Sequence, residues 1–491
     1  MKIETPTIDW AGLSPFLVLL GGASVILLVA VFLRDTRRNA FGAVVALLTL
    51  LGAGAAAVAL YVLDDTGAGI VADAIRRDRL ADLADVILIG ASLLTVLVSY
   101  REVDAAERRG DYYALLLSAV GGMAFFVAAN DLISLFLGLE WFSISLYILC
   151  AITSDRTQSL EAGLKYLVVG SFGSAILLFG SALVFGATGE VGFAQIAEQA
   201  PDADRFLLVT GLAMLLVGLG FKASAAPFHQ WTPDVYEGAP APVTGFMAAA
   251  TKVAALVLTL RFLTTAFPTE SELWTITLAV LSTISLTWGN LGALVQRNVK
   301  RLLAYSSISH AGFLLMPIAA GNTLGGRALL YYLIPYAALS IGAFAVVAAR
   351  ERELGQAVTL ENLAGRGWER PFHGAAMATF MLGFIGLPPT GLFLGKFYAF
   401  SALYDRGWVW LMVIGAVFTA VSIYYYLGVV RAMYMRPRLT AAAVAGGSPP
   451  KDLGLDVAIA GSLVVGVGSF FAVDELIDIA RDAVDFLTFP F

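Results

Sequence analysis

Five ionisable side chains stand inside long apolar runs of the sequence: Glu140, Lys222, Lys252, His310 and Lys396. An ionisable group at the centre of a bilayer costs roughly 2.5–3.5 kcal/mol on insertion scales, so apolar runs seldom contain one without a use. Desolvation disfavours the charged form of such a group, whereas an opposite charge about 4 Å away favours it. Because making or breaking a Glu–Lys pair can load or unload a proton, the set predicts a buried proton relay.

Each of these residues also has a structural interpretation, which the sequence alone leaves open. Glu140 could be a locally hydrogen-bonded acid that only positions helices, and Lys222 and Lys252 could form structural ion pairs. Lys396 could extend toward the end of its apolar run, and His310 could be a hydrogen-bonded core residue. The relay is the preferred hypothesis because several such residues occur in one chain.

Lys165 is the sixth candidate for the relay. It lies four residues after Glu161, and a Glu–Lys pair at this spacing is favourable on a helix surface. A structural pair and a role in the relay therefore explain Lys165 equally well. Asp234 and Glu237 lie in a turn flanked by prolines and mark either the mouth of a channel or a solvated loop.

The composition places the whole chain in a membrane. Of the 491 residues, 59% are hydrophobic and only 14% are charged, whereas soluble proteins carry about 25% charged residues. The single cysteine, Cys150, excludes an internal disulfide and an iron–sulfur cluster, and three histidines leave little for haem or zinc. The net charge of −6 offers nothing to a nucleic acid. We therefore expect no metal site and no nucleic-acid partner.

Fourteen apolar runs are long enough to cross a bilayer core of about 30 Å, which takes about 20 helical residues. The runs do not alternate with period two, so helices are expected rather than the strands of a barrel. They lie near 13–33, 40–63, 81–100, 111–129, 131–153, 159–186, 206–230, 240–265, 273–295, 300–320, 327–349, 373–403, 408–435 and 453–475. The prediction is an all-α polytopic membrane protein with about fourteen transmembrane helices.

Basic residues predict the orientation of the chain. If basic residues near the end of a span are counted with the adjacent connection, the connections after odd-numbered spans carry 18 Lys and Arg residues. The ends and the other connections carry nine, and Arg261 is one of these. The strongest clusters are Arg34, Arg37 and Arg38; Arg297, Lys300 and Arg301; and Arg436, Arg438 and Lys451. Since cytoplasmic loops carry the excess of positive charge, both termini should lie outside a bacterial or archaeal plasma membrane.

A weak internal repeat divides the chain. Residues 162–167 in span 6 resemble residues 328–333 in span 11, and proline interrupts a span roughly 60 residues after each. Repeats of five helices have inverted topologies, and broken helices in such repeats line ion paths. We predict three N-terminal helices, a first repeat of spans 4–8, a second repeat of spans 9–13, and a last helix with an acidic tail. Their boundaries are 1–110, 111–265, 266–437 and 438–491.

Several motifs carry a resemblance to a known family. Residues 221–246, with the sequence TPDVYEGAP at 232–240, resemble the signature of the antiporter-like, proton-translocating subunits of NADH-quinone oxidoreductase (respiratory complex I). The sequence of these residues is most similar to the subunit N branch of that family. Further matches in the same order lie at 139–147, 161–166, 300–310 and 386–396, and the resemblance covers about 111 to 437.

The resemblance implies a fold and residue roles. It implies two inverted five-helix repeats, with helices 7 and 12 broken. It further implies that Glu140 pairs with Lys222, that Lys252 passes protons inward through His310, and that Lys396 lies toward the exit. Lys165 matches a family lysine in span 6.

The family also implies where the redox chemistry takes place. NADH, FMN, the iron–sulfur clusters and quinone are expected in other subunits, so this chain should bind no cofactor. The expected partners are a neighbouring antiporter-like subunit, small multi-helix subunits of the membrane arm, the lipid bilayer and protons.

The sequence leaves three functions open. The chain could be a proton-pumping subunit of a redox-driven complex, in which quinone reduction elsewhere drives the relay and the complex is the enzyme. It could instead belong to a cation/proton antiporter or a related ferredoxin-driven complex, since the same fold and lysines occur there. A non-conducting scaffold is the third possibility, and the central Glu140 argues against it.

Overall fold

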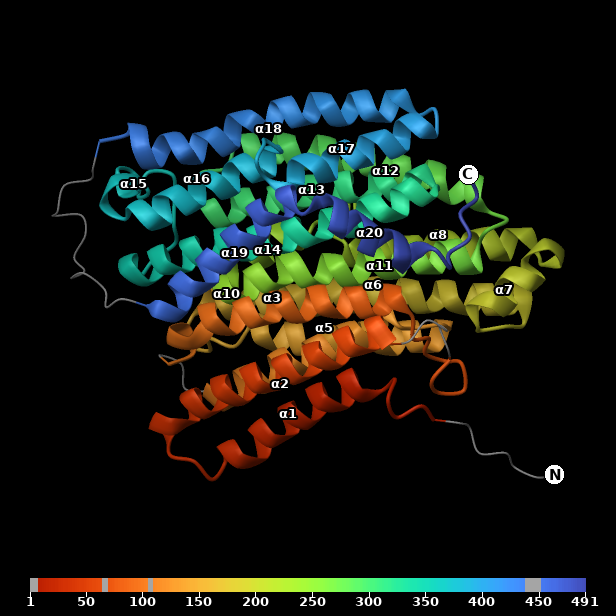
Figure 1. Ribbon diagram of the computed structural model, residues 1–491, viewed down its shortest axis with the longest axis horizontal. Coiled ribbons are helices and arrows are strands. Elements are labelled where there is room, and N and C mark those ends of the chain that lie inside the picture. Colours follow the sequence, from red (N-terminus) through yellow and green to blue (C-terminus); the bar gives the residue numbers. More distant parts are fainter. Residues whose placement is uncertain (1–7, 64–68, 105–108, 438–451) are drawn as a thin grey trace.

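The computed structural model describes residues 8–63, 69–104, 109–437 and 452–491. Within these ranges the long segments are all helices, and β-structure is limited to isolated bridges. The long helices lie side by side in one bundle, and the chain crosses back and forth between its two ends (Figure 1). The predicted all-α polytopic fold is confirmed.

Most predicted spans consist of one helix each, because uninterrupted apolar runs leave every backbone N–H and C=O to be satisfied within the helix. These helices are α1 (Ser14–Ala30), α2 (Asp35–Leu63), α3 (Arg79–Asp104), α4 (Arg109–Val127), α5 (Leu132–Cys150), α6 (Thr157–Thr188), α8 (Arg205–Lys222), α12 (Ser271–Leu294), α13 (Val299–Ala320), α14 (Thr323–Leu354), α18 (Val409–Met435) and α19 (Leu453–Phe471). By length and composition, 12 helical segments of the described chain can cross a membrane, and α1 and α16 are shorter apolar helices.

The two predicted breaks lie where proline interrupts the apolar runs. Helix α8 ends at Lys222, and turns connect it to the short helix α9 (Thr232–Gly238). The other broken span consists of α16 (Pro371–Ile385) and α17 (Gly391–Asp405). Proline lacks the N–H that would continue a helix, so backbone groups at both breaks remain open to side chains.

A third irregularity was not predicted from the sequence. Span 8 consists of α10 (Ala241–Phe246), a π-turn η2 (Met247–Thr251) and α11 (Lys252–Ala266). The π-turn directly precedes the first residue of α11, which is one of the candidate lysines. No proline or glycine lies inside the turn, so the sequence carries no local signal for it.

Short helices outside the spans were also missed. They are α7 (Phe193–Gln199), η1 (Ala200–Asp202), α15 (Arg366–Glu369) and α20 (Val473–Val484). The last of these gives the predicted acidic tail a structure, because α20 buries Ala480, Ala483 and Val484 and packs against α14 and α3. Its acidic residues alternate with apolar ones at helical spacing, so the segment folds onto the bundle.

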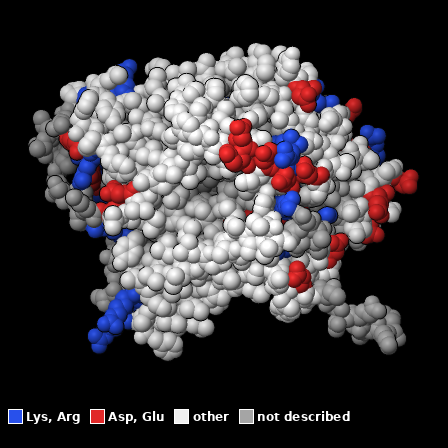
Figure 2. Space-filling model, in the orientation of Figure 1, with Lys and Arg blue, Asp and Glu red and all other residues white. Residues whose placement is uncertain are grey.

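The two ends of the bundle differ in charge. Helix α1 begins and the chain ends at one end of the bundle, which we call the terminal end (Figure 1). Acidic side chains gather toward this end, and the face between the two ends is mostly uncharged (Figure 2). Among the residues used to predict orientation, Arg438 and Lys451 lie outside the described residues.

Candidate functional site

Lys222 closes α8 at the first break and is almost completely buried, with 1% of its surface exposed. Its Nζ atom has no hydrogen-bond partner in the described structure. Instead, it lies 5.2–5.6 Å from the centres of four aromatic rings, which belong to Phe142, Tyr147, Tyr166 and Phe221. Aromatic faces attract a cation within about 6 Å, so in the described structure these rings surround an ammonium group that has no hydrogen-bond acceptor.

Glu140 lies on α5 and is half-buried. Its carboxylate accepts a hydrogen bond from the hydroxyl of Ser174 on α6. It forms no ion pair with Lys222 in the described structure, although the two groups interact electrostatically. The direct pair that the family resemblance implied is therefore not formed here, because Lys222 is directed into the aromatic rings and Glu140 toward α6.

Lys252 is completely buried at the start of α11. Its Nζ donates a hydrogen bond of 2.6 Å to the hydroxyl oxygen of Ser307 on α13. That hydroxyl lies 3.1 Å from the hydroxyl of Tyr336 on α14. The lysine thus begins a chain of exchangeable O–H groups that crosses three helices.

His310 lies one turn further along α13 than Ser306 and contacts two tyrosines. Its Nδ1 is 2.8 Å from the hydroxyl of Tyr332, and its Nε2 is 3.2 Å from the hydroxyl of Tyr426 on α18. The Tyr426 hydroxyl is in turn 2.5 Å from that of Ser306. Both ring nitrogens are therefore connected to hydroxyl groups, which is the arrangement that lets an imidazole accept a proton on one side and release it on the other.

Lys396 lies on α17 and reaches back to the second break. Its Nζ donates hydrogen bonds to the carbonyl oxygens of Phe384 and Ile385, at 3.1 and 2.9 Å. These residues end α16, where carbonyl groups lack intrahelical partners and the helix dipole favours a cation. The ring of Phe313 lies 4.2 Å from the same Nζ, and the ring of Phe384 lies 5.3 Å from that of His310.

Gly386 makes room for this lysine at the end of α16. Its φ angle is +86°, and a Cβ atom added there would lie 3.0 Å from Cδ of Lys396. Residues with a side chain rarely adopt this φ, so both the backbone turn and the path of the lysine favour glycine at this position.

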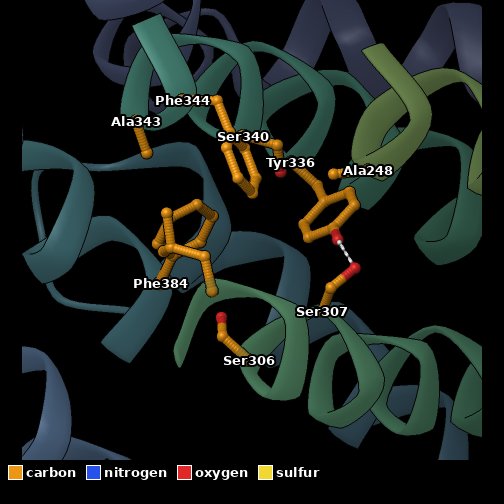
Figure 3. Close-up of a pocket in the computed structure, with 9 residues that line it drawn as sticks. Ala248, Ser306, Ser307, Tyr336, Ser340, Ala343, Phe344 and Phe384 are labelled. Atoms are coloured by element: carbon orange, nitrogen blue, oxygen red, sulfur yellow. Dashed lines mark hydrogen bonds between the residues drawn. The ribbon is translucent and has the colours of Figure 1, made fainter. Parts of the chain in front are cut away.

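A small cavity lies between Ser307, which accepts from Lys252, and Ser306, whose hydroxyl lies beside that of Tyr426 (Figure 3). Its volume available to water is about 10 Å³, which is the size that holds about one water molecule. The lining residues are Ala248, Leu303, Ser306, Ser307, Tyr336, Ser340, Ala343, Phe344 and Phe384. Figure 3 shows the Tyr336 hydroxyl directed at Ser307, with Ser306 on the same side of the cavity. A water molecule there would have the two or more polar partners that it needs to bridge the two serines.

Lys165 lies apart from all of these residues. Its side chain is 43% exposed and forms ion pairs with Glu161 at 2.8 Å and Asp234 at 2.9 Å. Asp234 also pairs with Arg301 at 2.7 Å. Burial alone would raise the pKa of Asp234, but the hydrogen bonds from Lys165 and Arg301 outweigh it and hold this pKa below its ordinary value. The local pair that the sequence offered as an alternative is therefore observed.

The structure thus sorts the six candidates into three places. Lys252, His310 and Lys396 lie close to one cluster of hydroxyl groups and rings, Glu140 and Lys222 lie near the first break, and Lys165 lies in a half-exposed ion-pair network. Among the described residues, no group of three or more His, Cys, Asp or Glu side chains could hold a metal ion.

Several polar residues of this region were missed by the sequence analysis. Tyr332 and Tyr336 lie four residues apart in one apolar run, and this spacing on one helix face was the available signal. Lys300 was treated only as a basic signal for orientation, but it is 2% exposed and pairs with Glu351 at 3.1 Å. Arg261 was counted in a connection and is in fact buried in α11.

Comparisons with known proteins show the family of the chain. A sequence profile of the family described as NADH:quinone oxidoreductase/Mrp antiporter, TM, matches residues 129–422. NADH-quinone oxidoreductase subunit N of Trichlorobacter lovleyi is 39% identical over 465 residues, which cover 94% of this chain and 95% of that protein. A chain of respiratory complex I from Thermus thermophilus, solved with bound aureothin, is 32% identical with a TM-score of 0.80, covering 95% of this chain and 99% of the other.

The fold occurs in a second kind of complex as well. A chain of the Mrp complex from Dietzia sp. has a TM-score of 0.85 at 20% identity, and the match covers 97% of both chains. At this identity the likeness concerns the fold alone.

Proposed function

The chain belongs to the NADH:quinone oxidoreductase/Mrp antiporter family, and on this premise we propose that it is a proton-translocating membrane-arm subunit of an NADH:quinone oxidoreductase. The observation that carries the proposal is the buried cluster around Lys252, His310 and Lys396. Hydroxyl groups line the route between its first two members, and a cavity of water size lies between Ser307 and Ser306 on that route. In our proposal the complex is the translocase, and this chain holds no redox centre.

The hydrogen bonds suggest how a proton would move between Lys252 and His310. A hydroxyl group can accept a proton from one neighbour and release its own to the next, so no heavy atom needs to travel far. Lys252 would give its proton to Ser307, and Tyr336 and a cavity water would carry it toward Ser306 and Tyr426. His310 would then receive it through one of its tyrosine partners.

Lys222 and Glu140 would control the charge beside the first break, where a proton would enter the relay. With the carboxylate at a distance, the ammonium group of Lys222 has only aromatic rings around it, and burial penalises its charge. If the two groups approach, the carboxylate stabilises the ammonium form and the lysine holds its proton. Movement between the two arrangements would load and unload Lys222, and its charge would act on the next lysine.

Glu140 also indicates where a partner lies. It is half-buried in the middle of an apolar span, although a carboxyl group that faces lipid is costly. We therefore place a neighbouring membrane-arm subunit over this face of α5, either a small multi-helix subunit or an antiporter-like one. Electron donors and quinone would act in other subunits, and we propose that this chain binds neither NADH, FMN, iron–sulfur clusters nor quinone.

We also infer the orientation of the chain from its charge distribution. The basic connections lie opposite the terminal end, so we place the terminal end outside a bacterial or archaeal plasma membrane and the basic end in the cytoplasm. Fusion of a reporter to the C-terminus that is active only outside the cytoplasm would test this placement.

Replacement of Lys252 tests the relay. The intact complex with Lys252→Ala, reconstituted in vesicles, should oxidise NADH but translocate fewer protons per NADH than the unaltered complex. Arg205→Ala is the matched control, since it removes a basic side chain that is 84% exposed and should change nothing. An unchanged proton yield in an assembled Lys252→Ala complex would refute the proposal.

A cation/proton antiporter subunit is the second candidate, favoured by the shared fold with the Mrp chain. Purification from the native membrane distinguishes the two functions. Co-purification with flavin and iron–sulfur subunits supports the redox-driven complex, and their absence supports the antiporter.

A further inference from the structure

A second group of buried charges lies toward the terminal end, outside the relay. Arg261 on α11 donates two hydrogen bonds of 2.6 Å to the carboxylate of Asp78, directly before α3. Arg77 donates one of 2.9 Å to Asp82 on α3. Each of these four side chains is at most 5% exposed, and the pairs balance two positive charges against two negative ones.

Asp85 is the fifth member of this group and forms no ion pair in the part of the chain that the structure describes. It lies three residues after Asp82 on α3 and is 3% exposed. The charged groups that act on it are Asp82 and Arg77. Its Oδ1 has no hydrogen-bond partner in the described structure, and neither do Nε and Nη1 of Arg77. A third guanidinium, that of Arg76, lies 3.7 Å from Asp78, so its charge acts on the Arg261–Asp78 pair.

Asp85 is placed where it can bind a proton. A buried carboxylate without a partner is costly, whereas a protonated carboxyl group is neutral. Asp85 forms no ion pair in the described structure, so a proton would remove the cost of its buried charge. Unpartnered atoms on Asp85 and Arg77 show that the group is not a closed set of ion pairs.

The position of the group relates it to the relay. Arg261 follows Lys252 by nine residues on the same helix, which is about 13.5 Å along the axis. Helix α3 packs against α11 and against the π-turn η2 that precedes Lys252. Arg76, whose side chain is 34% exposed, lies at the outer side of the group. The five groups thus occupy the layer between Lys252 and the terminal end.

We propose that Asp85 binds and releases a proton between the Lys252 region and the terminal end, an inference that rests on the proton-translocating function proposed above. An O–H bond forms at the Asp85 carboxylate when a water or a relay group gives up a proton, and it breaks when the proton passes to water at the terminal end. The Arg261–Asp78 pair is a positioning element that holds α3 against α11.

The test compares Asp85→Asn with Asp85→Glu in the intact complex reconstituted in vesicles. Asparagine keeps the size of the side chain but binds no proton, so the protons translocated per NADH should fall at least twofold. Glutamate keeps the titratable group and should retain most of the yield. Ser92→Ala is the matched control, because Ser92 is buried on the same helix and donates only to the carbonyl of Leu88.

An assembled Asp85→Asn complex with an unchanged proton yield would overturn the inference. If that variant does not assemble, infrared difference spectra of the unaltered and Asp85→Glu complexes decide, since a protonated carboxyl group has its own C=O band. A band that changes during turnover and shifts with glutamate supports the proposal, and its absence refutes it. Lys252→Ala distinguishes failure of this inference from failure of the proposed function. If Lys252→Ala abolishes translocation while Asp85→Asn does not, only this inference fails.

Discussion

Lys222 and Lys396 each lie beside the break of a broken span, yet the atoms around their ammonium groups differ in kind. Lys222 has no hydrogen-bond partner and is surrounded by four aromatic rings. Lys396 donates to two backbone carbonyls at the end of α16 and faces one ring. Both nitrogens are buried, so the contrast does not come from access to water.

The difference shows that the two breaks surround a buried lysine in different ways. The second break supplies carbonyl acceptors, and these fix one position of Lys396. In the described structure the first break supplies no acceptor to Lys222, and the contacts of its ammonium group with the rings are weak and non-directional. We infer that Lys222 is the lysine that moves and Lys396 the one that stays in place.

The largest difference should appear when both lysines are replaced by methionine. Lys222→Met puts an apolar chain among aromatic rings and leaves no partner unpaired, so the complex should remain as stable as before. Lys396→Met leaves the carbonyls of Phe384 and Ile385 without their donor, at about 1–3 kcal/mol for each buried group. We expect Lys396→Met to destabilise the chain by about 2–6 kcal/mol relative to Lys222→Met.

Thermal unfolding of the detergent-solubilised complex measures this difference. The proton yield should fall in both variants, and only Lys396→Met should lower Tm. Equal Tm values would show that the carbonyl contacts do not hold Lys396, and the contrast between the breaks would be lost.

Gly386 offers a smaller and more local change at the second break. Gly386→Ala places a side chain at a φ of +86° and a Cβ atom 3.0 Å from Lys396, so the lysine must shift. The backbone strain alone costs about 1–2 kcal/mol. Gly407→Ala is the matched control, because its φ is +81° and nothing lies within 4 Å of the added Cβ. Both variants should lose similar stability, but only Gly386→Ala should lower the proton yield. A similar yield in the two would mean that the position of Lys396 is not critical.

Much of the fold could be predicted from the sequence because a membrane-spanning helix requires a long apolar run, which is easily recognised. A long apolar run allows few alternatives in lipid, so helix limits such as those of α5 and α13 agree closely with the predicted runs. Proline likewise fixed the two breaks. The π-turn before Lys252 could not be predicted, since no residue in it breaks a helix; in the structure it packs against α3 and α14.

The sequence identified the charged residues of the site but not the hydrogen bonds that connect them. The cost of burying charge identified Lys252, His310 and Lys396, whereas their partners are tyrosines and serines that also occur as ordinary core residues. Arg261 escaped notice because it lies near the end of a run, where arginine side chains often reach water. Its partner Asp78 is 183 residues away in sequence, and only the fold brings them together.

The smallest effect is expected at Asp234, in the half-exposed network with Lys165 and Arg301. Ion pairs of this exposure contribute about 0–1 kcal/mol, so Asp234→Asn should lower the stability by less than 1 kcal/mol at neutral pH. The pKa of Asp234 in the folded chain lies below its ordinary value, so the carboxylate stabilises the fold above about pH 4. This contribution disappears as the pH falls through the lowered pKa, and the variant and the unaltered chain should then unfold alike. Tm values measured from pH 7 to pH 3 test this, and a difference that grows toward low pH would contradict it. A large loss of proton yield in Asp234→Asn would show instead that the surface network belongs to the relay.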